Sequence, residues 1–174
     1  MIKKDTPVEK IVELGHCHLG TACAKCNEGC QQGSGCFTEE QLPKTAKFLK
    51  LDEENFKKIW LEPMTRFNTT LFRPKIKRTG KHAGQCVFFD EKEGCMIHEA
   101  KPMECKISNH NEYGEALHLW FTLNHFVNPT DPQSVREWAT YIESGGAVIP
   151  GGSLSELVPN QKTLRKMLEY KILR

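Results

Sequence analysis

Eight cysteines lie in the 174-residue chain, and all of them fall between residues 17 and 105. Cys23, Cys26 and Cys30 follow the spacing CxxCxxxC, which folds a short backbone around one centre and directs several sulfurs toward it. Thiolates are the soft ligands that zinc and iron–sulfur clusters share. Packing of small apolar residues does not require such clustering, so we interpret the cysteines as metal ligands. The candidates are Cys17, Cys23, Cys26, Cys30, Cys36, Cys86, Cys95 and Cys105.

Three histidines are further ligand candidates. His16 and His18 flank Cys17, and His98 follows Cys95 by three residues. An imidazole in such a position can bind the metal itself or hydrogen-bond to a ligand. Because histidine is more often a surface or hydrogen-bonded residue, these three rank after the cysteines.

The cysteine spacing favours an iron–sulfur cluster and leaves zinc open. Structural zinc sites commonly use two paired knuckles, CxxC with a second CxxC or with HxxxH. Here a single CxxC is followed by isolated thiols. Eight thiols suit one cluster such as [4Fe–4S] with spare cysteines, two four-ligand sites, or a larger multinuclear site.

The opening residues predict a reducing compartment. They read MIKKDTPVEKIVELGHCHLG and lack the apolar stretch and cleavage site of a signal peptide. No apolar run approaches the roughly 18 residues that would span a membrane. We therefore expect a cytoplasmic protein that does not enter the membrane, in which thiols bind metal or react rather than form disulfides.

One segment of the chain is strongly basic, although the formal net charge is only +2. The segment RPKIKRTGKH has no acidic residue and could bind a phosphate, a nucleic-acid backbone or an acidic partner. It lacks the interleaved aromatic residues that stack on bases, which disfavours nucleic acid. A solvated loop is the simpler alternative to a docking site for a protein redox partner. The cations are Arg73, Lys75, Lys77, Arg78 and Lys81.

The elements around the cysteines predict a small, irregular α+β or mainly α fold with amphipathic helices and short strands. Residues 37–50 predict a helix capped by Thr38, whose start Pro43 kinks or delays. A second helix is capped by Asp52 and ends at Pro63. Apolar runs on either side of EKEG, at 86–90 and 94–99, predict a hairpin. The apolar stripe expected on the second helix is Phe56, Ile59 and Trp60.

Residues 113–174 contain no cysteine, and we expect them to support the metal-binding region of residues 16–107 within one domain spanning 1–174. Residues 117–124 alternate with period two, which predicts a strand, although so apolar a stretch also suits a helix. Residues 130–146 predict a capped amphipathic helix, and 149–159 a loop. The face of a final helix consists of Leu164, Met167, Leu168 and Ile172.

The ordered combination of CxxCxxxC, a glycine-bearing turn, a helical segment and CVFFDEKEGCMIHEAKPMEC resembles the YkgJ family of cysteine-cluster proteins. That family is described as a zinc- or iron-chelating domain, and the resemblance covers about residues 17 to 107. Gln31 stands where the family has a second adjacent cysteine, which Cys36 would replace. His98 occupies the position of a tyrosine in the family pattern, and Lys101 and Lys106 occupy the positions of arginines. The resemblance implies a metal centre, with an iron–sulfur cluster as the first choice.

These observations predict an iron–sulfur protein that transfers electrons or serves as a redox or assembly component of a larger system. A zinc-stabilised binding module without a redox role is the alternative, and a cluster-dependent enzyme of unknown substrate is the third. No nucleophilic serine elbow, phosphate-binding loop or HExxH motif points to catalysis by side chains alone.

Overall fold

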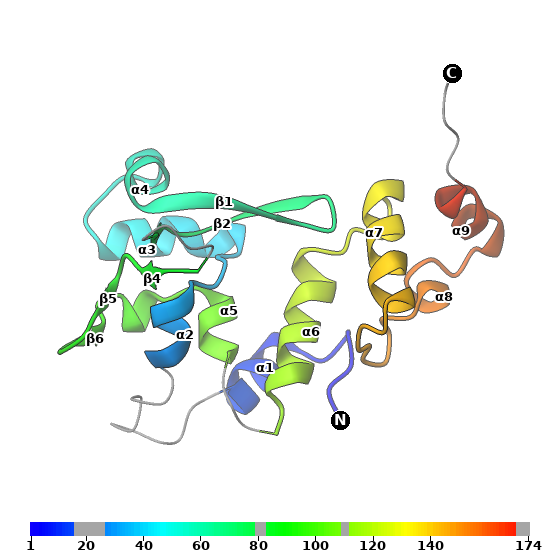
Figure 1. The fold of residues 1–174 in the computed structure, drawn as a ribbon, viewed down its shortest axis with the longest axis horizontal. Helices are drawn as coiled ribbons and strands as arrows, with labels where there is room; N and C mark the ends of the chain where they lie inside the picture. Colours follow the sequence, from blue (N-terminus) through cyan, green and yellow to red (C-terminus); the bar gives the residue numbers. More distant parts are fainter. Residues whose placement is uncertain (16–26, 79–82, 109–111, 170–174) are drawn as a thin grey trace. The chain divides into compact units, whose positions relative to one another are not determined.

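The computed structural model describes residues 1–15, 27–78, 83–108 and 112–169. Their backbone contacts divide the chain into two units (Figure 1). The cysteine unit consists of Val12–Met64 and Leu71–Gly114, and the helical unit consists of Met1–Ile11, Thr65–Thr70 and Glu115–Arg174. Helices and short antiparallel strand pairs make up the described residues, which confirms the predicted α+β class. The division of the chain into one domain with two regions stays a prediction.

The cysteine unit combines short helices with small antiparallel strand pairs. Strand β1 pairs with β2, β3 with β4, and β5 with β6. Helix α1 (Val8–Gly15) ends in this unit. The other helices are α2 (Asn27–Gln32), the 3₁₀ turn η2 (Glu39–Gln41), α3 (Leu42–Phe48), α4 (Glu53–Trp60), η3 (His98–Ala100) and α5 (Met103–Ile107). The strands are β1 (Leu61–Arg66), β2 (Thr69–Pro74), β3 (Ile76–Lys77), β4 (Gln85–Cys86), β5 (Phe89–Asp90) and β6 (Gly94–Cys95). The tip of the β1–β2 pair, Thr65–Thr70, belongs to the helical unit.

The helix predicted to follow Thr38 is present, and its start is delayed as expected from Pro43. Residues Glu39–Gln41 form a 3₁₀ turn, and the regular helix α3 begins at Leu42 with Pro43 in its first turn. Proline is tolerated there because the first backbone N–H groups of a helix have no partner within the helix. The backbone N–H of Thr38 donates to Gln41 Oε1 at 3.1 Å.

Helix α4 is capped as predicted, but its apolar stripe is narrower and it ends earlier. The Asp52 carboxylate accepts from the Asn55 N–H at 2.8 Å, and Phe56 is fully buried. Ile59, however, is 49% exposed, so its place in the stripe was wrong. The helix ends at Trp60, and strand β1 begins at the next residue. Pro63 therefore lies inside the strand rather than at the end of the helix.

The hairpin of β1 and β2 was not predicted. Prolines near its two ends conceal the strand pattern, since proline is rare in strands. Its turn residues Phe67 and Asn68 both have positive φ, 48° and 55°. Positive φ at both central residues is the backbone shape of the tightest hairpin turns.

A hydrophobic core fills the cysteine unit. Phe37 meets Phe56 edge to face, with ring centroids 5.7 Å apart, and Trp60 lies against Phe88 at 5.1 Å. Cys86 belongs to this core, and Cys30 and Cys95 pack against it. Packing contacts with this core therefore help to fix the positions of these three cysteines. Its buried members are Phe37, Leu42, Ala46, Phe56, Leu61, Cys86, Phe88, Phe89 and Ile97.

The strand predicted for residues 117–124 is wrong, because these residues lie in helix α6 (Gly114–His125). Leu117, and every residue from Leu119 to Leu123, is buried. A helix that is buried on almost all sides shows no 3.6-residue period, so an accidental alternation dominated the pattern. Among the described residues, no helix is long and apolar enough to cross a membrane.

The other helices of the helical unit agree more closely with the predictions made from the sequence. Helix α7 (Pro132–Glu143) is capped by Asp131, which accepts from the Gln133 N–H at 3.0 Å. The expected loop 149–159 contains the short helix α8 (Leu154–Leu157). Helix α9 (Gln161–Leu168) packs against α7 with Leu164 buried, whereas Leu168 is 37% exposed. Ile172 lies outside the described residues.

An ionic clamp joins strand β1 to the chain beyond β3. Both guanidinium NH₂ groups of Arg78 donate to the Glu62 carboxylate, at 2.8 and 2.9 Å, and Arg73 Nε donates to it at 2.9 Å. The hydrogen bonds from Arg78, and next those from Arg73, hold the pKa of Glu62 below its usual 4.5. The clamp therefore stabilises the fold above the pKa of the unfolded state and loses its effect as the pH falls through the folded-state pKa.

We predict that Glu62→Gln lowers the free energy of unfolding by about 1–2 kcal/mol at pH 7, since charge-assisted bidentate bonds are stronger than neutral ones. Urea unfolding at pH 7 and at pH 3 measures this, and the difference from the unsubstituted protein should shrink at the lower pH. Glu91→Gln, at an exposed turn residue, is the control and should change little. An equal loss at both pH values would contradict the ionic explanation.

Candidate metal centre

Five of the eight predicted ligand cysteines lie within the described residues, all in the cysteine unit, and none of these five forms a disulfide. They come from α2, the segment before Phe37, β4, β6 and α5. In chain order they are Cys30, Cys36, Cys86, Cys95 and Cys105. Cys17, Cys23, Cys26, His16 and His18 lie outside the described residues, so their roles stay predictions.

Four of the thiols are close enough to act on one another electrostatically. Burial raises the pKa of Cys86 to about 11, and the charges of Cys30 and Cys95 act in the same direction. Burial also raises the pKa of the Cys105 thiol, with further contributions from Cys30 and Cys86. We call Cys30, Cys86, Cys95 and Cys105 the four-thiol cluster. The raised pKa values keep Cys86 and Cys105 as neutral thiols near pH 7 in the metal-free chain.

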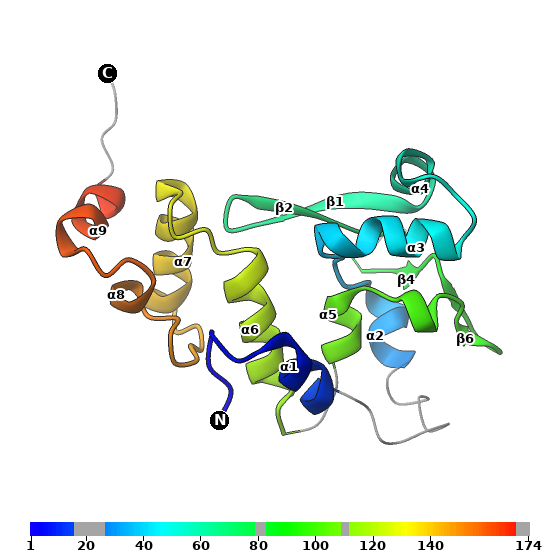
Figure 2. The same ribbon diagram turned by 180° about the vertical axis from the view of Figure 1, so that it is seen from behind.

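Short strand pairs and helices bring the four-thiol cluster together. In the antiparallel pairs, Cys86 lies opposite Ile76 and Cys95 lies opposite Phe89. Helix α2, which carries Cys30, packs against β4, and α2, β4 and α5 lie beside one another in Figures 1 and 2. Residues separated by up to 75 positions in the sequence therefore come within electrostatic range of one another.

The hairpin predicted around EKEG is present and explains the spacing of Cys86 and Cys95. The Asp90 carboxylate accepts from the N–H groups of Lys92 and Glu93, at 2.8 and 2.9 Å, and so closes the turn. Gly94 has φ +78°, which glycine adopts without strain. The turn returns the chain so that Cys95 reaches the neighbourhood of Cys86.

Cys105 receives a hydrogen bond from the backbone. The Gly35 N–H donates to Cys105 Sγ at 3.2 Å. A Cβ atom at residue 35 would lie 2.8 Å from both the backbone N and the Sγ of Cys105. Glycine is therefore required here for the two chain segments to approach.

A buried carboxylate, which the sequence analysis missed, adjoins the four-thiol cluster. Glu104 is 5% exposed, and its Oε2 accepts from the Cys36 N–H at 2.7 Å. Cys36 itself is fully buried. Helix α5 is too short to show an amphipathic period, so nothing in the local sequence distinguishes Glu104 from a surface glutamate. The replacement of a missing family cysteine by Cys36 stays a prediction.

His98 lies exposed in η3, after β6. The positive charge of Lys101, and then partial burial, hold its pKa below the usual 6.5. His98 is therefore neutral near pH 7, the form that binds metals. Its role as a ligand stays a prediction.

The donor chemistry of the four-thiol cluster suits a thiophilic metal. Its four sulfur atoms are soft donors within electrostatic range of one another, and Cys105 Sγ accepts an N–H. Among the residues that the structure describes, no three His, Cys, Asp or Glu side chains converge closely enough to hold a metal ion. Three further candidate cysteines lie outside those residues.

The sequence of residues 22–126 matches the family model CxxCxxCC, described as "Putative zinc- or iron-chelating domain". The match covers more than half of the chain. The chain belongs to this family. Membership confirms the resemblance to cysteine-cluster proteins and agrees with both cofactors considered, an iron–sulfur cluster and zinc. No curated protein and no solved structure matches the chain.

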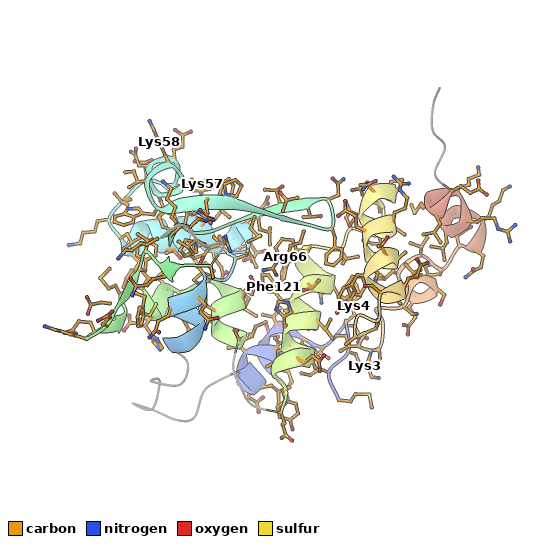
Figure 3. All side chains as sticks on the ribbon, in the orientation of Figure 1. Lys3, Lys4, Lys57, Lys58, Arg66 and Phe121 are labelled. Atoms are coloured by element: carbon orange, nitrogen blue, oxygen red, sulfur yellow. The ribbon has the colours of Figure 1, made fainter. Side chains whose placement is uncertain are left out.

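Most of the described cations of the basic segment bind within the chain. Arg73 and Arg78 hold Glu62, and the Lys75 ammonium donates to the carbonyls of Lys58 and Ile59 at 2.9 and 2.7 Å, where helix α4 ends. Figure 3 shows Lys57 and Lys58 on this helix. Lys77 is exposed, and its charge acts on Cys86 and Asp90. Lys81 lies outside the described residues.

We predict that Gly35→Ala lowers the free energy of unfolding of the metal-free protein by about 1–3 kcal/mol, as an overpacked core contact does. The added methyl group also displaces the Cys105 sulfur, so the metal content of the purified protein should fall. Urea unfolding and elemental analysis measure the two effects.

The matched control is Gly33→Ala, two residues away, where an added Cβ meets no heavy atom within 4 Å. Gly33→Ala should retain both metal content and stability. Equal behaviour of the two variants would show that the close contact with Cys105 is unimportant.

Proposed function

We propose that this protein binds an iron–sulfur cluster through cysteine thiolates and serves in electron transfer, or as a redox or assembly component of a larger system. The observation that carries the proposal is the four-thiol cluster, contributed by four separate elements. Four thiolates are the common ligand set of a [4Fe–4S] cluster. The cluster would supply one-electron chemistry, while the chain would hold the sulfurs and limit access of water.

The two ends of the undescribed segment 16–26 support the proposal. At one end, a Cβ atom on Gly15 would lie 2.7 Å from the Cα of Ile107, so Gly15 lies against helix α5 two residues from Cys105. At the other end, Asn27 begins helix α2, which carries Cys30. Cys17 is two residues after Gly15 in the sequence. Cys26 directly precedes Asn27.

The charge balance of the four-thiol cluster favours a bound cation. Burial is the main cause of the raised pKa values of Cys86 and Cys105 in the metal-free chain, and the charges of neighbouring thiols act in the same direction. A metal centre reverses this preference, because it binds the deprotonated form and releases the protons. The N–H donated to Cys105 Sγ is also one of the groups by which proteins adjust a cluster's potential.

A zinc-stabilised binding module is the second candidate. The strands β3 to β6 contain two residues each, and strands this short gain stability when a metal links them. A zinc ion would supply that link without redox chemistry.

We predict that anaerobically purified protein contains iron with a matching amount of acid-labile sulfide, and has a visible band that dithionite bleaches. The measurement is elemental and sulfide analysis combined with the visible spectrum before and after reduction. Zinc without sulfide, in a colourless protein, would contradict the redox proposal and favour the zinc-stabilised binding module.

We also propose that a protein redox partner with acidic groups docks on the basic segment beside the cluster. The argument rests on Lys77, which is exposed and whose charge reaches Cys86. A positive surface speeds the approach of negatively charged partners at low ionic strength.

Lys77→Glu should slow oxidation of the reduced protein by the anion ferricyanide, by several-fold at low salt, and speed oxidation by cationic hexaammineruthenium(III). Lys44→Glu, at an exposed lysine of α3, is the control, and stopped-flow absorbance at equal metal content is the measurement. Unchanged rates with both oxidants would rule out this docking site.

A further inference from the structure

We propose that Glu104 is a positioning residue, which holds the segment Ser34–Phe37 against helix α5 so that the Gly35 N–H points at the Cys105 sulfur. The inference rests on the proposed function, because it assigns Glu104 a role in adjusting a metal ligand. It goes beyond the cysteines themselves by naming the group that sets the environment of one of them.

The burial of Glu104 calls for an explanation. A carboxylate that is 5% exposed loses most of its hydration, which is costly unless protein donors replace the water. Its Oε2 accepts from the Cys36 N–H at 2.7 Å, a short bond to a charged acceptor. The Glu104 N–H in turn donates to the Cys36 carbonyl at 3.4 Å. These two bonds bind residue 104 to residue 36 from both sides.

The neighbouring hydrogen bond is the one that reaches the sulfur. Gly35 and Cys36 are consecutive, and their N–H groups donate to the consecutive residues Cys105 and Glu104. Two successive N–H groups of one segment therefore bind two successive residues of helix α5. The carboxylate of Glu104 is held in one half of this pair, which fixes the other half on Cys105 Sγ.

The far side of the segment is anchored independently. The Ser34 hydroxyl donates to the Pro74 carbonyl at 2.6 Å, and the Phe37 N–H donates to the Phe72 carbonyl at 2.8 Å. Strand β2 therefore holds both ends of the segment, while Glu104 holds its middle. Loss of the Glu104 carboxylate would remove one of the two bonds at Cys36 and leave both ends of the segment attached, so the predicted effect is local to Cys105.

The test compares three substitutions of Glu104, which distinguish the loss of its hydrogen-bond acceptor oxygen from the loss of its negative charge. Glu104→Gln keeps an acceptor oxygen at the same reach and removes the charge. Glu104→Asp keeps the charge but shortens the side chain by one methylene, so that its oxygen lies farther from the Cys36 N–H. Glu104→Ala removes both the acceptor oxygen and the charge. The readouts are the rate at which EDTA removes the bound metal and the position of the sulfur-to-metal charge-transfer band.

A positioning role predicts the slowest release for the unsubstituted protein and Glu104→Gln, faster release for Glu104→Asp, and the fastest for Glu104→Ala, by about 10–100-fold. The charge-transfer band should shift in the same order. Glu99→Gln and Glu99→Ala, at an exposed glutamate of η3, are the controls and should match the unsubstituted protein.

The reverse order, with Glu104→Asp normal and Glu104→Gln impaired, would overturn the inference, as would identical release from all variants. If Glu104→Ala does not fold, the comparison of Glu104→Gln with Glu104→Asp decides alone. Absence of iron and zinc from the unsubstituted protein would instead refute the proposed function, so the two failures are distinguishable.

Discussion

The burial of thiols beside the hydrophobic core is the constraint on which the proposed centre depends. Cys86 is 7% exposed and belongs to the hydrophobic core, and its pKa is raised to about 11. A buried group of this kind stays neutral until a cation arrives. The same burial that disfavours the metal-free thiolates would protect a bound centre from water. Stability and metal binding are therefore linked in the cysteine unit through the protonation of its thiols.

The architecture around the thiols consists of small elements joined by specific contacts. The aromatic pairs and Glu62 with its two arginines form the framework of this unit. On that framework, two close contacts at glycines bring the cysteine-bearing segments together, Gly35 at Cys105 and Gly15 at Ile107. Glu104 adds a buried polar contact at the first of these two places.

Features set by nearby residues could be predicted from the sequence, and features set by distant contacts could not. The sequence predicted a cap at Asp52, a cap at Asp131 or Thr130, and a hairpin around EKEG, all of which depend on residues a few positions apart. The structure confirms the first cap and the hairpin, and it selects Asp131 as the second cap. Helix α6 was mistaken for a strand because burial on almost all sides removes its period. Gly35 and Glu104 act across about 70 residues, so their roles followed only from the structure. The cysteine pattern predicted the family, which the family match confirms.

The central claim is that cysteine thiolates, including those of the four-thiol cluster, hold the metal. X-ray absorption at the metal edge of anaerobically purified protein tests this most directly. The account predicts a first shell dominated by sulfur, at about 2.3 Å if the metal is zinc, and a lower sulfur coordination number or metal content in Cys86→Ser. A first shell of nitrogen and oxygen alone, or a spectrum unchanged by Cys86→Ser, would contradict it.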